Sequence, residues 1–111
     1  MPNVRKQEII NYVSKATGVD KVETSTVIED FLRTIIETLA TGNDIEIRGF
    51  GSFRVKKKNG RMARNPKTGE EVYIETRYAP TFKFSRDFRD YVIEKMKAAE
   101  LKSNQKLTEN E

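Results

Sequence analysis

The sequence predicts an α+β fold, with helices at both ends of the chain and antiparallel strands between them. Apolar residues recur at helical spacing before residue 42 and again after residue 85, whereas the segment between them alternates apolar and polar residues. The chain has 111 residues, 36% of them hydrophobic, which suffices for one small domain with a thin core. Such a core stabilises a monomer weakly, so we expect an oligomer.

Two helices are expected before residue 42. The first covers residues 4–17, and Gly18 supplies its stop. The second follows Asp20, which can cap it with Glu23 at capping-box spacing, and Gly42 ends it. Its apolar residues form adjacent pairs repeated every four positions: Val27, Ile28, Phe31, Leu32, Ile35, Ile36 and Leu39. A stripe this wide predicts burial on two sides; we expect a second subunit on one of them, with the sheet as the alternative or additional cover.

The central segment is typical of short strands that continue into a long hairpin. Residues 45–47 and 53–55 alternate apolar and polar side chains on either side of a glycine-rich turn at 49–51. Between residues 56 and 71 almost every apolar side chain disappears, and alternation then resumes. The turn signal Asn-Pro-Lys-Thr-Gly at 65–69 lies where a hairpin tip would fall. The sequence therefore predicts a polar two-stranded ribbon rooted in the core.

A third helix is expected after Phe84, with Ser85 as its cap. One face of this helix carries Phe88, Tyr91, Val92 and Met96. Residues 98–111 contain no aromatic residue and only two leucines. We therefore expect the helix to end within about one turn of Ala98 and the rest of the tail to be disordered.

The composition excludes several classes of active site. The chain has no Cys and no His, which removes thiol nucleophiles, disulfides, thiolate or imidazole metal sites, and the usual general base near neutral pH. No apolar run approaches the ~20 residues that cross a bilayer, and the N-terminus lacks the apolar stretch of a signal peptide. We expect an intracellular, non-enzymatic binding protein without a metal or cofactor.

Basic residues are concentrated in one segment. Residues 48–67 hold eight Lys or Arg and no Asp or Glu, whereas the rest of the chain holds 13 basic and 17 acidic residues. A charge run is most often a solvated surface, but a polar ribbon of about 35 Å has no face to bury and is marginally stable alone. An elongated polyanion would order it. Duplex DNA has that charge and size, and Arg61 and Arg64 suit its narrow minor groove.

The turn and the ribbon also resemble a known family. Gly49-Phe50-Gly51-Ser52-Phe53, Lys58, Arg61, Ala63 and Arg64-Asn65-Pro66-Lys67-Thr68-Gly69 are similar to the arm motif of the bacterial HU/IHF family of histone-like DNA-bending proteins. The resemblance runs from about residue 6 to residue 92. It implies an intertwined dimer with a helical base, a saddle-like antiparallel sheet and two extended β-ribbon arms. Residues 1–97 would form the DNA-binding domain, with the arm at about 55–75, and residues 98–111 a polar tail.

The resemblance also implies roles for individual residues. Arg61, Arg64 and Asn65 would lie in the minor groove, and Pro66 would intercalate between base pairs. The residues expected to contact phosphates or to hold the DNA backbone against the body are Lys6, Arg48, Gly49, Gly51, Ser52, Arg54, Lys56, Lys58, Lys67, Lys83, Ser85 and Arg86. One departure stands out: before the last helix the family commonly has a small residue or proline followed by Gly, whereas this chain has Phe84-Ser85.

The predicted function is a non-enzymatic architectural protein that bends and compacts duplex DNA with weak sequence preference. Distorted DNA should be preferred, a homodimer is expected, and a heterodimer is the alternative assembly. The predicted location is the cytoplasmic nucleoid, with no membrane partner. Two alternatives stay open: a site-specific IHF-like heterodimer subunit, and an RNA-binding or scaffold protein whose arms grip folded RNA or an acidic partner.

Overall fold

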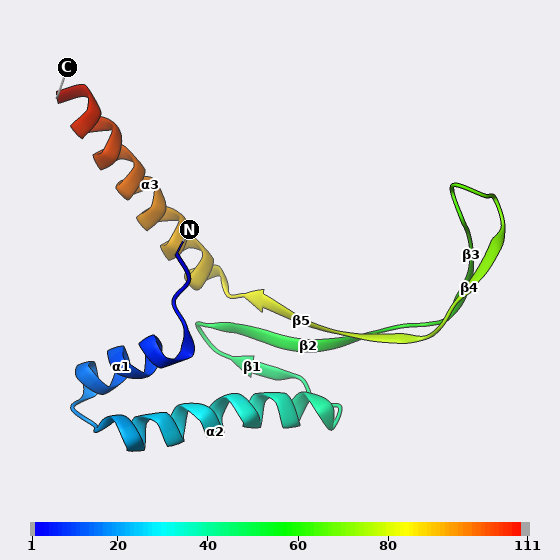
Figure 1. Ribbon diagram of the computed structural model, residues 1–111, viewed down its shortest axis with the longest axis horizontal. Coiled ribbons are helices and arrows are strands. Elements are labelled where there is room, and N and C mark those ends of the chain that lie inside the picture. The colour runs from blue at the N-terminus through cyan, green and yellow to red at the C-terminus, as the bar shows by residue number, and fades with distance from the viewer. Residues whose placement is uncertain (1, 110–111) are drawn as a thin grey trace. The chain divides into compact units, whose positions relative to one another are not determined.

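The computed structural model describes residues 2–109 and divides into two compact units, residues 1–41 and 42–111 (Figure 1). The first unit contains two helices, α1 (Lys6–Thr17) and α2 (Lys21–Ala40). The second contains the strands and the last helix. This order of elements confirms the predicted α+β class.

The helix ends of the first unit follow local sequence signals. Helix α1 ends at Gly18, whose φ of 78° lies in the left-handed region that suits glycine, and the Gly18 N–H donates to the Ser14 carbonyl. A carboxylate oxygen of Asp20 accepts a hydrogen bond from the Glu23 N–H at 2.9 Å, so the predicted cap of α2 is confirmed. Helix α1 starts two residues later than predicted, because Arg5 is in extended backbone.

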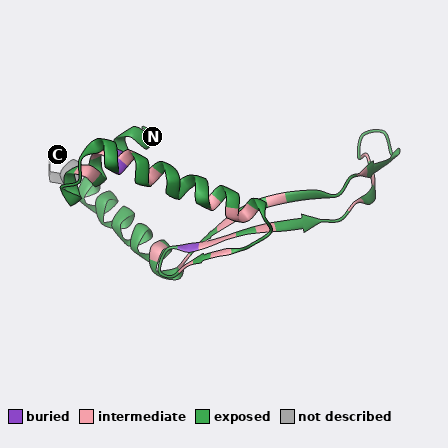
Figure 2. Cartoon of the chain, turned by 90° about the horizontal axis from the view of Figure 1, so that it is seen from below, coloured by how far each residue is buried: buried purple, intermediate pink, exposed green. Residues whose placement is uncertain are grey.

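The packing of α1 against α2 leaves most apolar side chains of this unit uncovered. Ile10 is the one buried apolar residue among residues 2–104, the part of the chain whose side chains are described. Along α2, Val27, Phe31 and Ile36 are 66%, 54% and 65% exposed. Figure 2 shows how little of either helix is buried. Within the first unit, α1 therefore leaves a large part of the stripe predicted on α2 uncovered.

The second unit is built on one long antiparallel hairpin. Strands β1 (Ile45–Ile47), β2 (Gly51–Lys58) and β5 (Arg77–Phe84) form a three-stranded sheet in the order β1-β2-β5. Strands β3 (Arg61–Arg64) and β4 (Glu71–Ile74) form a separate two-stranded ribbon. The predicted tip is confirmed: the Asn65 N–H donates to the Glu70 carbonyl at 2.9 Å, and the Gly69 N–H donates to the Asn65 carbonyl at 2.7 Å.

The two paired regions are separated by a short break in the ladder. The last pair of the sheet is Lys58 with Arg77, and the first pair of the ribbon is Arg61 with Ile74, so the register is the same on both sides. At the break, the Gly60 N–H donates to the Thr76 hydroxyl at 3.0 Å instead of to a backbone carbonyl. Val55 pairs with Pro80, so the returning strand reaches the level of Val55 only at residue 80.

Five phenylalanines form a cluster that holds the base of the hairpin to the start of helix α3 (Arg86–Glu109). The ring centroids of Phe53 and Phe82 are 4.6 Å apart, and those of Phe84 and Phe88 are 4.7 Å apart. Phe50 joins them through contacts with Phe82 and Phe88. The bulky Phe84, which stands before α3 where the family commonly has a small residue or proline, is therefore accommodated by packing into this cluster.

Helix α3 is longer than the sequence led us to expect. Its predicted cap is confirmed, because the Ser85 hydroxyl accepts a hydrogen bond from the Phe88 N–H at 3.1 Å. The predicted disordered tail is wrong, because the helix continues to Glu109, while residues 110–111 lie outside the described part. Residues 98–109 contain no Gly or Pro and several strong helix formers. No α-helix of residues 2–109 is long and apolar enough to span a bilayer.

Truncation after Met96 is expected to shorten α3 without weakening the rest of the protein. The described side chains from residue 97 to residue 104 are all exposed, and exposed residues contribute little to the free energy of unfolding. The melting temperature should change by no more than about 3 °C, while the helical circular dichroism signal falls. A larger loss of melting temperature would show that the extension packs on the body.

Candidate nucleic-acid interface

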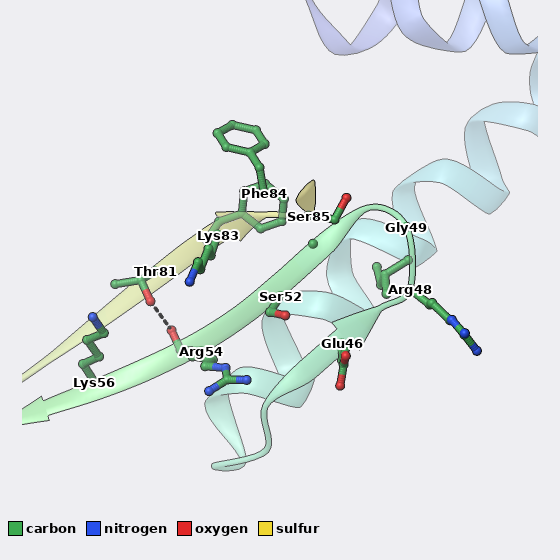
Figure 3. Close-up of a pocket in the computed structure, with 13 residues that line it drawn as sticks. Glu46, Arg48, Gly49, Ser52, Arg54, Lys56, Thr81, Lys83, Phe84 and Ser85 are labelled. Atoms are coloured by element: carbon green, nitrogen blue, oxygen red, sulfur yellow. Dashed lines mark hydrogen bonds between the residues drawn. The ribbon is translucent and has the colours of Figure 1, made fainter. Parts of the chain in front are cut away.

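The three-stranded sheet has one apolar and one polar face. Because alternate residues of a strand point to opposite faces, the register of the three strands assigns each side chain. The apolar face carries Ile45, Ile47, Phe53, Val55, Phe82 and Phe84. The polar face carries Glu46, Ser52 and Lys83 in one row across the sheet, followed outward by Arg54 opposite Thr81. Figure 3 shows the Phe84 ring on the other side of the sheet from Arg54 and Glu46.

Five cations line up on the polar face, which we call the basic face: Arg54, Lys56, Lys58, Arg77 and Lys83. The pairs Lys56–Ala79 and Lys58–Arg77 continue the rows along the arm. The inner end of this face borders a pocket of about 700 Å³. Its lining includes eight residues predicted to contact DNA: Arg48, Gly49, Gly51, Ser52, Arg54, Lys56, Lys83 and Ser85. Glu46 is the one acidic residue in that lining.

Glycine is required for structural reasons at both predicted positions of the turn, 49 and 51. Gly49 has a φ of 82°, and the Phe50 N–H closes the turn by donating to the Ile47 carbonyl at 2.9 Å. At Gly51, a Cβ atom would lie 2.5 Å from the Lys83 carbonyl oxygen and 2.6 Å from the Phe82 ring. Both glycines therefore shape the wall of the pocket, and a side chain at position 51 would push β2 away from β5.

The strand register reveals two things that the sequence pattern did not. Arg77 was missed as a candidate, although it lies opposite Lys58 on the basic face. The sequence did contain a signal, because Arg77, Thr81 and Lys83 are separated by even numbers of positions and so share one face of a strand. Lys57, between two candidates in the sequence, points to the opposite face with Tyr78.

The charge of the arm is less one-sided than the outgoing strand alone indicated. The returning segment contributes Glu70, Glu71 and Glu75, and Glu71 lies directly opposite Arg64. The lack of acidic residues therefore holds for residues 48–67 and not for the whole hairpin. Most of the cations that share one face lie on the basic face, near the root of the arm.

Near the tip, the residues predicted to bind in the groove differ in exposure and in the face of the ribbon to which they point. Asn65 is half-buried, and its side-chain oxygen accepts a hydrogen bond from the Lys67 N–H at 2.9 Å. Pro66 and Lys67 are exposed at the turn. Arg61 and Arg64 are three residues apart on β3, so they point to opposite faces of the ribbon and are not brought together.

Two candidates lie outside the sheet and already face carboxylates. The Lys6 ammonium lies 3.2 Å from a Glu29 carboxylate oxygen within the first unit. Arg86, at the start of α3, lies 3.8 Å from Asp90. Exposed ion pairs of this kind contribute little stability, so a phosphate could replace either carboxylate. Within residues 2–109, no three acidic side chains gather into a metal site.

The sequence matches the family described as bacterial DNA-binding protein over residues 4–93. DNA-binding protein HU 1 of Bacillus subtilis is 35% identical over 92 residues, covering 83% of this chain and 100% of that protein. Integration host factor subunit alpha of Haemophilus influenzae is 39% identical over 89 residues, covering 80% of this chain and 93% of that one.

Solved structures agree with the sequence matches. The cocrystal structure of Anabaena HU with DNA has a TM-score of 0.68 and 34% identity, over 80% of this chain and 97% of that one. HU from Thermotoga maritima has a TM-score of 0.57 and 27% identity, over 80% of this chain and 98% of that one. The matched family region ends at residue 93, so most of the long α3 lies beyond it.

Proposed function

The chain belongs to the bacterial DNA-binding protein family that includes HU and the integration host factor subunits, and from this we propose that it is an architectural protein that binds and bends duplex DNA. The observation that carries the proposal is the basic face, where five cations follow one side of the sheet and arm. Cations spaced along a strand suit phosphates, which carry no sequence information, so sequence preference should be weak. The chain would act in the nucleoid, by binding and without catalysis.

The acting form would be a dimer whose subunits bury the exposed stripe of α2. Val27, Phe31 and Ile36 form part of an apolar surface that a single chain leaves in water, and a second copy offers a matching stripe. A homodimer is the simplest assembly, and a heterodimer with a related subunit would use the same surface. In either form, residues 1–97 would constitute the DNA-binding domain, with α3 extending beyond it.

Each arm would follow the minor groove away from the body of the dimer. Arg54, Lys56 and Lys58 would contact phosphates near the root, while Arg64 and Asn65 would enter the groove near the tip. Pro66 would insert between base pairs there. Unstacking a base step costs a few kcal/mol. This cost is offset by contacts with the extra DNA backbone that the bend brings onto the basic faces.

A competition experiment tests this function. A labelled duplex with a nick is bound by the full chain and then displaced by unlabelled nicked duplex, linear duplex, single-stranded DNA or duplex RNA of the same length. An architectural DNA-bending protein should be displaced best by nicked DNA, since pre-distorted DNA costs less to bend. Displacement by RNA at equal or lower concentration would favour the RNA-binding alternative instead.

Pro66→Ala is expected to reduce DNA bending with little effect on protein stability. Pro66 is exposed at the tip and far along the hairpin from the phenylalanine cluster, so the melting temperature of the free protein should stay within about 2 °C of the parent. Energy transfer between dyes at the ends of a short duplex should report a smaller bend. Preference for nicked over linear DNA should fall by about tenfold.

Thr68→Ala is the matched control for this measurement, because Thr68 occupies the same turn. It should lose only a weak hydrogen bond, in which its hydroxyl accepts from the Glu70 N–H at 3.3 Å. Equal bending by Pro66→Ala and the parent would make Pro66 a turn former and remove it from the bending mechanism.

A further inference from the structure

Two exposed apolar side chains face each other on one face of the arm. Met62 on β3 pairs directly with Tyr73 on β4, and the two residues are 58% and 60% exposed. Directly opposed residues in an antiparallel pair lie on the same face, with Cβ atoms about 5 Å apart. The two side chains therefore form one apolar patch on the arm, which we call the Met–Tyr pair.

The Met–Tyr pair lies on the continuation of the basic face. The register is unchanged across the ladder break, so Met62 shares a face with Lys56 and Lys58, and Tyr73 shares it with Arg77. Gly60 gives an independent check. A Cβ atom placed on Gly60 would lie 2.3 Å from the Tyr73 hydroxyl oxygen, so the side-chain direction of residue 60 and the tyrosine ring are on the same side of the arm.

Along this face, cations stand on both sides of the Met–Tyr pair, and two carboxylates, Glu71 and Glu75, alternate with Tyr73 on the returning strand. Lys58 and Arg77 precede it on the side of the root, and Arg64 follows it on the side of the tip, two residues or about 7 Å from Met62. A DNA strand offers the complementary order, because each deoxyribose lies between two phosphates. The sugars also form the walls of the minor groove, and their exposed surface there is largely C–H.

Part of the tyrosine ring has a local structural role, since aromatic side chains commonly cover a glycine on the neighbouring strand. That role accounts for the ring edge near Gly60. It does not account for the large exposed remainder of Tyr73, nor for Met62, which is 58% exposed. Leaving both in water would be unfavourable, which favours an apolar surface on the ligand.

We infer that the Met–Tyr pair packs against the deoxyribose walls of the minor groove and thereby selects DNA over RNA. This inference rests on the proposed function. In an RNA duplex, 2′-hydroxyl groups line the minor groove, and covering them with apolar side chains would remove their water without offering a hydrogen-bond partner. The pair would thus favour DNA and disfavour RNA, whereas the cations on either side bind both.

The test compares the full-length parent with Met62→Gln, which keeps the side-chain length but adds a polar end, and with Met62→Gln/Tyr73→Gln, which also replaces the aromatic ring with a polar side chain. Val72→Gln is the matched control: Val72 is 49% exposed on the same ribbon, but pairs with Ala63 on the opposite face. Affinities for a DNA duplex and for an RNA duplex of the same sequence are measured over a series of salt concentrations, and melting temperatures are recorded for every variant.

The double variant should bind DNA about tenfold more weakly, and Met62→Gln alone about threefold more weakly. The loss for RNA should be smaller, and the dependence of log K on log salt should not change, because no cation is removed. The inference is overturned if Met62→Gln leaves DNA affinity unchanged, if Val72→Gln weakens it as much as the double variant, or if DNA and RNA lose affinity equally. A parent that fails to bind duplex DNA would instead refute the proposed function.

Discussion

Phe31→Asp is expected to leave no folded protein at micromolar concentration. Phe31 is 54% exposed in the single chain and lies within the apolar stripe of α2, which we propose is buried between two subunits. A carboxylate there would be transferred from water to an apolar interface without a partner, which is strongly unfavourable. Because a single chain buries so little apolar surface of its own, loss of the interface should mean loss of the fold.

Circular dichroism and sedimentation measure this result together. The variant should lack both the helical signal and the mass of a dimer, and its thermal transition should disappear. Thr26→Asp is the matched control, since this substitution adds the same charge to the exposed polar side of the same helix. A folded monomer of Phe31→Asp would show that one chain is stable alone and that the stripe serves another purpose.

Neutralising the basic face of the arm is expected to weaken DNA binding at least about a thousandfold near physiological salt. The variant replaces Arg54, Lys56, Lys58 and Arg77 with glutamine, which removes eight cations from a dimer. If each contacts a phosphate, the slope of log K against log salt should become less negative by about 7, since each contact contributes about 0.9. The melting temperature should change little, because these side chains are exposed.

The face assignment has its own control in two neighbouring residues. Lys57→Gln and Lys58→Gln remove the same charge from adjacent positions that point to opposite faces of β2. Lys58→Gln should flatten the salt slope, and Lys57→Gln should leave it nearly unchanged. Equal effects from the two variants would mean that binding responds to the total charge of the arm and not to one face of it.

Features coded by neighbouring residues were predictable from the sequence. Asp20 and Ser85 cap their helices as predicted, and Gly18 ends α1. The turn at 65–69 closes the hairpin where its residue types indicated. In each case, the residues that interact lie within a few positions of one another, so a local pattern contains the whole interaction.

Features that depend on strand pairing were not predictable in the same way. The side chain of Arg77 joins the basic face only because β5 pairs with β2 in one register, and a shift by one residue would turn it to the other face. The position of Glu71 opposite Arg64 has the same origin. The length of α3 was not predictable for another reason: its last part has strong helix formers but few apolar residues, and low hydrophobicity is shared by exposed helices and disordered segments.

The ladder break at Gly60 and Thr76 has a kinetic consequence. Between the two paired lengths of the hairpin, the Gly60 N–H bonds to a hydroxyl and not to the backbone of the other strand, so we expect the outer length to bend at this point without opening a backbone pair. We then expect complex formation in two stages, an encounter at the root and a later closure of the tip. Salt should slow the first stage, which is guided by charge, whereas the second proceeds within the bound complex and sets how long the protein remains on DNA.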